Sequence, residues 1–97
     1  MTIASLRLRA HFERTRQGKR GEVTRFYLIV LEPQRQLSLE GSRGFDLLIV
    51  RGRVGGPRKA TTKRITFPTL PTAVERWGVL CARRRSRGYV ERGAPDQ

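Results

Sequence analysis

Two arginines flank a single glycine where a hydrophobic segment ends, in the stretch Arg51-Gly52-Arg53. Successive side chains of a β-strand point to opposite faces, so both guanidinium groups are expected on the same side. A guanidinium group donates several hydrogen bonds from one plane, which suits a phosphate group. The glycine would let such a phosphate approach the backbone. The pattern predicts an anion-binding strand end; the alternative is a solvated strand end in which Gly52 serves twist or packing.

Two more groups of cations follow in the chain. The first belongs to the next turn and strand, where lysines four residues apart share a face but also discourage edge-to-edge aggregation. The second is the run "RRRSRGY", in which steps of three and four residues align arginines on one side of a helix. Complementing the helix dipole would need only one or two of these cations. The predicted nucleic-acid-binding residues are Arg51, Gly52, Arg53, Arg58, Lys59, Lys63, Arg83, Arg84 and Arg87.

The chain of 97 residues has a formal net charge of +13, which is more than solubility requires. Such an excess favours an anionic partner, with nucleic acid ahead of an acidic protein or membrane. The charge is uneven, because Glu75 is the sole acid between Leu47 and Val90. A further basic cluster lies in a polar segment near the N-terminus: Arg14, Arg16, Lys19 and Arg20. We expect one strongly positive part of the surface.

Other chemistry is poorly supported by the sequence. No nucleophile with a base partner and no carboxylate pair emerges, so we expect no enzymatic activity and no cofactor. His11 has no nearby cysteine or paired acids, so no metal site is expected. A single cysteine, Cys81, fits a reducing compartment, and no signal-peptide hydrophobic region is present. The apolar runs are too short to span a bilayer. We therefore expect a cytoplasmic protein, and we expect it to be a monomer.

Hydrophobic patterning predicts a series of strands. Residues 6–13 alternate between apolar and polar side chains, as in a half-buried strand, and a polar loop is expected at 15–24. The continuous apolar segment 25–32 suggests a strand buried on both faces, and a short edge strand is expected at 37–39. The segments 45–54 and 59–67, joined by a turn at Gly55-Gly56-Pro57, suggest a hairpin.

After Pro68 the hydrophobic period changes to steps of three and four residues, which indicates a helix. Thr69 is a suitable N-cap, a later start at Thr72 is the alternative, and Gly88 is a natural residue just past the end. Trp77 and Cys81 are predicted to face the core. The expected fold is α+β: a small antiparallel sheet of about four to five strands with one C-terminal helix, in a single domain at 1–92 with a flexible tail at 93–97.

The order of these parts resembles the WGR domain over roughly residues 24–90. The resemblance comprises "RFYLIVLE", a hydrophobic strand ending in Gly-Arg-Val-Gly, a basic strand ending in phenylalanine, "TLPTA" at the helix start and "RRRSRGY" at its end. WGR domains occur in DNA-break-sensing poly(ADP-ribose) polymerases and as small free-standing bacterial proteins. The family's name-giving triplet is Trp-Gly-Arg, and here it is Arg51-Gly52-Arg53. Arg53 therefore matches the family's arginine, whereas Arg51 replaces the tryptophan.

The resemblance implies a module that binds the DNA backbone near a strand end. In the polymerases the tryptophan packs against a sugar at the break, and a guanidinium group cannot supply the same surface, so the preference for DNA ends is in doubt for this chain. The leading hypothesis is phosphate-mediated nucleic-acid binding, with DNA favoured over RNA. The alternatives are a protein-interaction adaptor that docks an acidic partner, and RNA binding.

Overall fold

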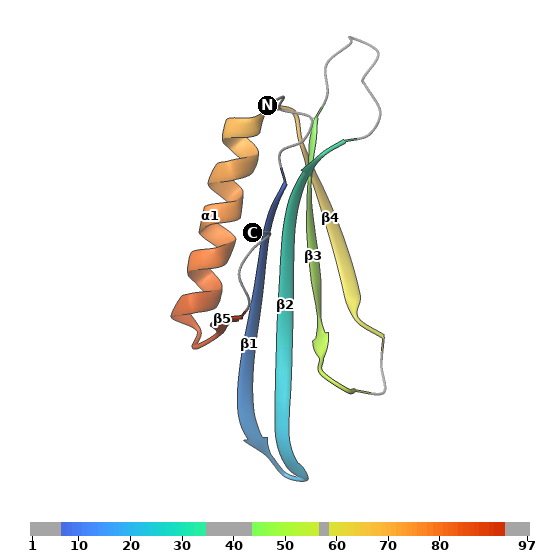
Figure 1. Cartoon of the computed structure of the whole chain (residues 1–97), viewed down its shortest axis with the longest axis vertical. Helices are drawn as coiled ribbons and strands as arrows, with labels where there is room; N and C mark the ends of the chain where they lie inside the picture. The colour runs from blue at the N-terminus through green and yellow to red at the C-terminus, as the bar shows by residue number, and fades with distance from the viewer. Residues whose placement is uncertain (1–6, 35–43, 57–58, 93–97) are drawn as a thin grey trace.

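One antiparallel sheet of five strands, with a single helix packed on one face, makes up the fold (Figure 1). The computed structural model describes residues 7–34, 44–56 and 59–92. The predicted α+β architecture is therefore confirmed, while the edge strand expected at 37–39 and the tail at 93–97 lie outside the described residues. Along the sheet the strands follow the order β4-β3-β2-β1-β5. The elements are β1 (Leu8–Gly18), β2 (Gly21–Pro33), β3 (Phe45–Arg53), β4 (Thr61–Phe67), α1 (Leu70–Ser86) and β5 (Val90–Arg92).

The hydrophobic core lies between α1 and the central strands. Residues directly opposite each other in antiparallel strands share a face, and the register aligns Ala10, Ile29 and Ile49 across β1, β2 and β3. The largest fully buried side chains are Phe12, Ile29, Leu31 and Leu47. The core thus occupies one half of the sheet's length.

The helix contributes small residues to this core. Ala73 and Cys81 are buried, and Trp77 is partly buried and packs against the core cluster, so both Trp77 and Cys81 lie where the sequence predicted. The helix begins after Thr69, also as predicted, but the Thr69 hydroxyl contacts the Thr72 hydroxyl at 2.8 Å and makes no bond to a backbone N–H. No helix in the described ranges is long and apolar enough to cross a membrane.

The prediction of a polar loop at 15–24 is wrong. β1 and β2 stay paired through this segment, from Thr15↔Thr24 to Gly18↔Gly21, and only Lys19 and Arg20 form the turn. β3 pairs with β2 no further than Arg25, apart from one hydrogen bond from Val54 to Thr24. Residues 15–24 therefore form a two-stranded extension, which we call the ribbon, that projects beyond the sheet at the bottom of Figure 1.

The chain reverses directly after the helix. The N–H of Gly88 bonds the carbonyl of Arg85 at 3.1 Å, and the N–H of Tyr89 bonds the carbonyl of Arg84 at 3.1 Å. This pair of bonds is the Schellman motif, and it needs the left-handed backbone of Gly88, whose φ is 86°. The reversal sends the chain into β5, which pairs with β1 at Glu13↔Val90. The sequence did not predict this strand.

The two strand boundaries at the β3–β4 connection also differ from the prediction. β4 begins at Thr61 and not at Lys59, and β3 ends at Arg53 and not at Val54. Val54 and Gly55 lie in a turn, as the Gly55-Gly56-Pro57 sequence indicated, and residues 57 and 58 lie outside the described part of the chain.

Candidate nucleic-acid interface

Three arginines lie side by side across the three central strands. Arg14 on β1 is the direct partner of Arg25 on β2, and Arg25 is the direct partner of Arg53 on β3. Arg14 follows the buried Phe12 by two residues, so the three side chains lie on the sheet face that packs against α1. We call this set the arginine row. It places three cations on neighbouring strands, which are about 4.8 Å apart in a sheet.

A second line of residues joins the sheet to the end of the helix. Tyr27 on β2 is the direct partner of Arg51 on β3, next to the arginine row on the same face. The guanidinium carbon of Arg84, from α1, lies 4.2 Å from the centre of the Tyr27 ring. Arg51 and Arg84 thus approach the same tyrosine from the sheet and from the helix. The structure brings together these two cations, which lie 33 positions apart in the sequence.

The pKa of Tyr27 reflects this environment. Partial burial raises the pKa of its phenol, but the hydrogen bond with Arg51 and the positive charges of Arg84 and Arg51 together outweigh burial. The net effect holds the pKa of Tyr27 below its ordinary value of 10.0. The arginines thus stabilise negative charge at the Tyr27 oxygen, and a phosphate bound nearby would experience the same positive potential.

A second tyrosine, Tyr89, closes the space under the helix end. It is 7% exposed, and its ring meets the Tyr27 ring edge-on with 5.2 Å between centroids. Arg14 lies over the Tyr89 ring at 4.8 Å and donates a hydrogen bond of 2.8 Å to the carbonyl of Arg87. Both tyrosine rings are therefore in contact with guanidinium groups, which leaves them poorly placed to stack on a base.

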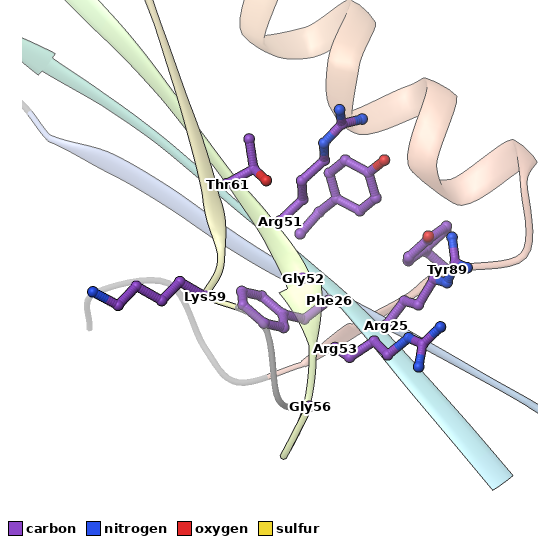
Figure 2. A pocket seen from close by; sticks show the side chains of 10 residues that line it. Arg25, Phe26, Arg51, Gly52, Arg53, Gly56, Lys59, Thr61 and Tyr89 are labelled. Carbon is purple, nitrogen blue, oxygen red and sulfur yellow. The ribbon is translucent and has the colours of Figure 1, made fainter.

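These residues line a hollow of about 640 Å³, which adjoins a second hollow of about 250 Å³. Arg25 and Arg53 line both, so we describe the two as one basic groove. Figure 2 shows the larger hollow. Among the described residues, no aspartate or glutamate lines either hollow. The groove lining is Arg14, Arg16, Gln17, Gly18, Val23, Arg25, Phe26, Tyr27, Arg51, Gly52, Arg53, Gly56, Lys59, Thr61 and Tyr89.

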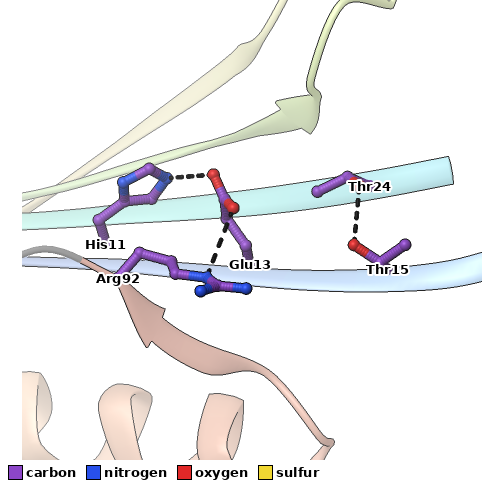
Figure 3. Close-up of polar contacts among 5 residues, drawn as sticks. All are labelled: His11, Glu13, Thr15, Thr24 and Arg92. Carbon is purple, nitrogen blue, oxygen red and sulfur yellow. Dashed lines mark hydrogen bonds and ion pairs between the residues drawn. The ribbon is translucent and has the colours of Figure 1, made fainter.

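Four of the described acidic side chains pair with cations outside the groove. Glu32 lies 3.8 Å from Arg7, Asp46 lies 3.5 Å from Arg64, and Glu91 lies 2.9 Å from Arg85. Glu13 contacts His11 at 3.3 Å and Arg92 at 3.7 Å (Figure 3). Within the part of the chain that the structure describes, no ion pair involves the arginine row or Arg51. The positive charge of the groove is therefore not neutralised from within.

The predicted binding residues are only partly brought together. Arg51, Gly52, Arg53 and Lys59 line the groove, although the Lys59 side chain points away from the arginines (Figure 2). Arg84 reaches the helix end of the groove through its side chain, which lies over the Tyr27 ring. Arg87 takes part there only through its backbone carbonyl, which accepts the hydrogen bond from Arg14.

The remaining predicted residues are not placed in the groove. Lys63 lies on β4 opposite Ile49 and lines neither hollow, and Arg83 is exposed on α1 without a described contact to the groove. Arg58 lies outside the described residues.

Packing explains why residue 52 is a glycine, and this is the alternative that the sequence left open. Its missing side chain would point to the face opposite the two arginines. A Cβ atom there would lie 3.2 Å from the Phe26 ring and 3.3 Å from the Cα of Ala60. Gly52 thus admits the Phe26 ring against β3 and lets Ala60, which directly precedes β4, approach.

Sequence reasoning missed Arg14, Arg25, Tyr27 and Tyr89 as parts of the site. Arg14 was assigned to a loop cluster and Arg25 to the start of a strand, and only the register aligns them with Arg53. The signal was present in the two-residue turn at Lys19-Arg20, because pairing outward from that turn makes Arg14 and Arg25 partners.

The site contains no recognisable metal centre, since the described residues include no group of three or more histidine, cysteine or acidic side chains that could hold an ion. Comparison with protein-family models, curated proteins and solved structures finds no match to this chain.

Proposed function

We propose that the chain binds nucleic acid through phosphate contacts in the basic groove, with DNA favoured over RNA. The observation behind this proposal is the arginine row: Arg14, Arg25 and Arg53 on three adjacent strands, with no described acid to pair them. Like charges directly opposite each other destabilise a sheet. A polyanion would relieve that repulsion, so the arrangement favours binding over stability.

The geometry suits a phosphate backbone better than a single small anion. The row spans about 10 Å, which is two strand spacings, and Arg51 and Arg84 extend the cations toward the helix. Backbone contacts of this kind position a protein on nucleic acid without selecting sequence. Because both tyrosine rings contact guanidinium groups, the affinity is expected to depend on charge more than on base stacking.

We also propose that the chain is a WGR-like domain, which would favour DNA as the ligand. Arg53 would act as the family's arginine, within the groove. Arg51, in the place of the family's tryptophan, approaches Tyr27 and is not free to form an apolar platform. We therefore propose backbone binding without a dependence on strand ends.

Binding measured by fluorescence anisotropy at several salt concentrations tests the proposal. Labelled duplex DNA, nicked DNA and duplex RNA should be compared, with polyglutamate as a polyanion without phosphates. For about four to six phosphate contacts, log affinity for duplex DNA should fall with log salt at about −0.9 per contact. Equal affinity for polyglutamate would indicate an acidic protein partner instead, and an affinity that does not change with salt would remove the proposal.

A further inference from the structure

The ribbon is the part of the fold that the core does not explain. From Thr15 to Gly21 every side chain is exposed, and the apolar residue Val23 is only partly buried. A two-stranded hairpin without a packed face is marginally stable in water. The structure describes little in compensation beyond the backbone pairing and a 2.8 Å contact between the Thr15 and Thr24 hydroxyls (Figure 3).

The ribbon begins at the arginine row. Thr15 and Thr24 follow directly from the Arg14↔Arg25 pair, so whatever binds the row also lies at the base of the ribbon. The ribbon itself has three cations, Arg16, Lys19 and Arg20, against one acid, Glu22. It is therefore a positively charged, two-stranded projection beside a proposed phosphate site.

We propose that the ribbon enters the major groove of duplex DNA while the arginine row contacts the phosphates at the groove's edge. This inference rests on the proposed function and adds to it the form of the ligand. The major groove is about 12 Å wide and 8.5 Å deep and admits a two-stranded β-ribbon. From Arg14 to Gly18 the ribbon extends about 14 Å at 3.4 Å per residue, which is enough to reach the groove floor.

The side chains of the ribbon can read base edges. Arg16 lies on the same face as the arginine row, because it follows Arg14 by two residues, and Gln17 lies on the other face. Arginine forms paired hydrogen bonds with guanine O6 and N7, and glutamine with adenine N6 and N7. The arginine row thus supplies sequence-independent contacts, and Arg16 and Gln17, which line the ribbon end of the groove, add base contacts. Duplex RNA should bind more weakly, because its major groove is too narrow for side chains to read.

Dimethyl sulfate footprinting tests the inference directly, because the reagent methylates guanine N7, which lies in the major groove. Sites bound by the natural chain should be selected from random duplex DNA and then footprinted. Guanines within the selected sites should be protected, and the double variant Arg16→Ala/Gln17→Ala should lose that protection. Both side chains are exposed, so the variant is expected to fold, which circular dichroism checks.

Two further variants separate this inference from the proposed function. Arg9→Ala removes an exposed cation from the opposite face of the sheet and should leave protection intact. Arg25→Ala/Arg53→Ala should weaken binding to all duplexes while leaving the ribbon unchanged. If the natural chain binds DNA but Arg16→Ala/Gln17→Ala keeps the full footprint, the ribbon inference fails alone. If the natural chain binds no DNA, both proposals fail.

Discussion

Arg25 and Arg53 are direct partners in the register of β2 and β3, and no acidic side chain of the described residues pairs with either. Two guanidinium groups in such positions repel each other, and the free energy of folding must offset that repulsion. Carboxylates elsewhere on the molecule neutralise cations outside the groove, such as Arg64 and Arg85. The arrangement concentrates unpaired positive charge at one place on the molecule.

Arg25→Ala and Arg53→Ala should each weaken DNA binding, by a similar factor on unrelated sequences. Loss of one phosphate contact should reduce the magnitude of the log–log salt slope by about 0.9. Anisotropy titrations at four or more salt concentrations measure both quantities. Because each substitution removes a like charge from a repulsive pair, the melting temperature should not fall.

Arg9→Ala is the matched control for these variants. It removes the same charge from an exposed position on the opposite face of the sheet. It should change affinity only through net charge, and less than Arg25→Ala does. Equal effects of all three substitutions would show that overall charge, and not the arginine row, determines binding.

Tyr27→Phe should alter the pH dependence of stability in one direction. The folded-state pKa of Tyr27 lies below its unfolded value of 10.0 because the contributions of Arg51 and Arg84 outweigh burial. Between the two pKa values the unfolded chain binds more protons, so the natural chain gains stability as pH rises through that window. Denaturant unfolding at pH 7.5 and near pH 10 should show a natural-minus-variant difference in unfolding free energy that grows with pH. A difference independent of pH would contradict this account of the site.

Gly52→Ala and Gly78→Ala should shift stability in opposite directions. At Gly52 a Cβ would crowd the Phe26 ring at 3.2 Å and the Ala60 backbone at 3.3 Å, and overpacking of this kind costs about 1–3 kcal/mol. Gly78 lies in α1 with nothing within 4 Å of its Cβ position, so alanine should stabilise the helix by about 0.5–1 kcal/mol. Thermal unfolding of both variants measures the difference. If Gly52→Ala is more stable than the natural chain, the Phe26 ring and Ala60 must move aside without a large cost in free energy.

Cys81 should react slowly with thiol reagents while the chain is folded. Burial raises the pKa of its thiol, more than the nearby Arg85 lowers it, and the side chain packs in the core beneath α1. As the single cysteine of the chain, it gives one unambiguous readout. Labelling by Ellman's reagent at pH 8 should be far slower than for a free cysteine and should reach the free rate in concentrated urea. Rapid labelling under folding conditions would show that the helix detaches from the sheet readily.

The elements with a buried face were predictable from the sequence. β1 was found through the alternation that ends in Phe12, and α1 through the spacing of Leu70, Trp77 and Cys81, because burial imposes those periods. The sequence predicts a loop in place of the ribbon, because neither face of the ribbon is buried and no such period exists there. β5 was missed because three residues, Val90 to Arg92, have little strand preference of their own and depend on pairing with β1.

The candidate site was half predictable for a related reason. Arg51 and Arg53 are two residues apart in one strand, so the sequence alone predicts that their side chains lie on the same face. Arg14 and Arg25 join Arg53 only through the register of three strands, which is set by turns and packing distant from each residue. Helical spacing groups Arg83 with Arg84, but Arg84 lies over the Tyr27 ring and Arg83 is exposed, and the sequence does not show which arginine of the run faces the sheet.

Arg14 belongs to the arginine row and also contacts the end of α1. It donates a hydrogen bond to the Arg87 carbonyl and lies over the Tyr89 ring. A ligand that binds this guanidinium group must break both contacts. Binding in the groove should therefore reduce the order of the helix terminus. The bound molecule should therefore show a looser last helical turn than the free one, and amide hydrogens of Gly88 and Tyr89 are the atoms at which that exchange would be visible.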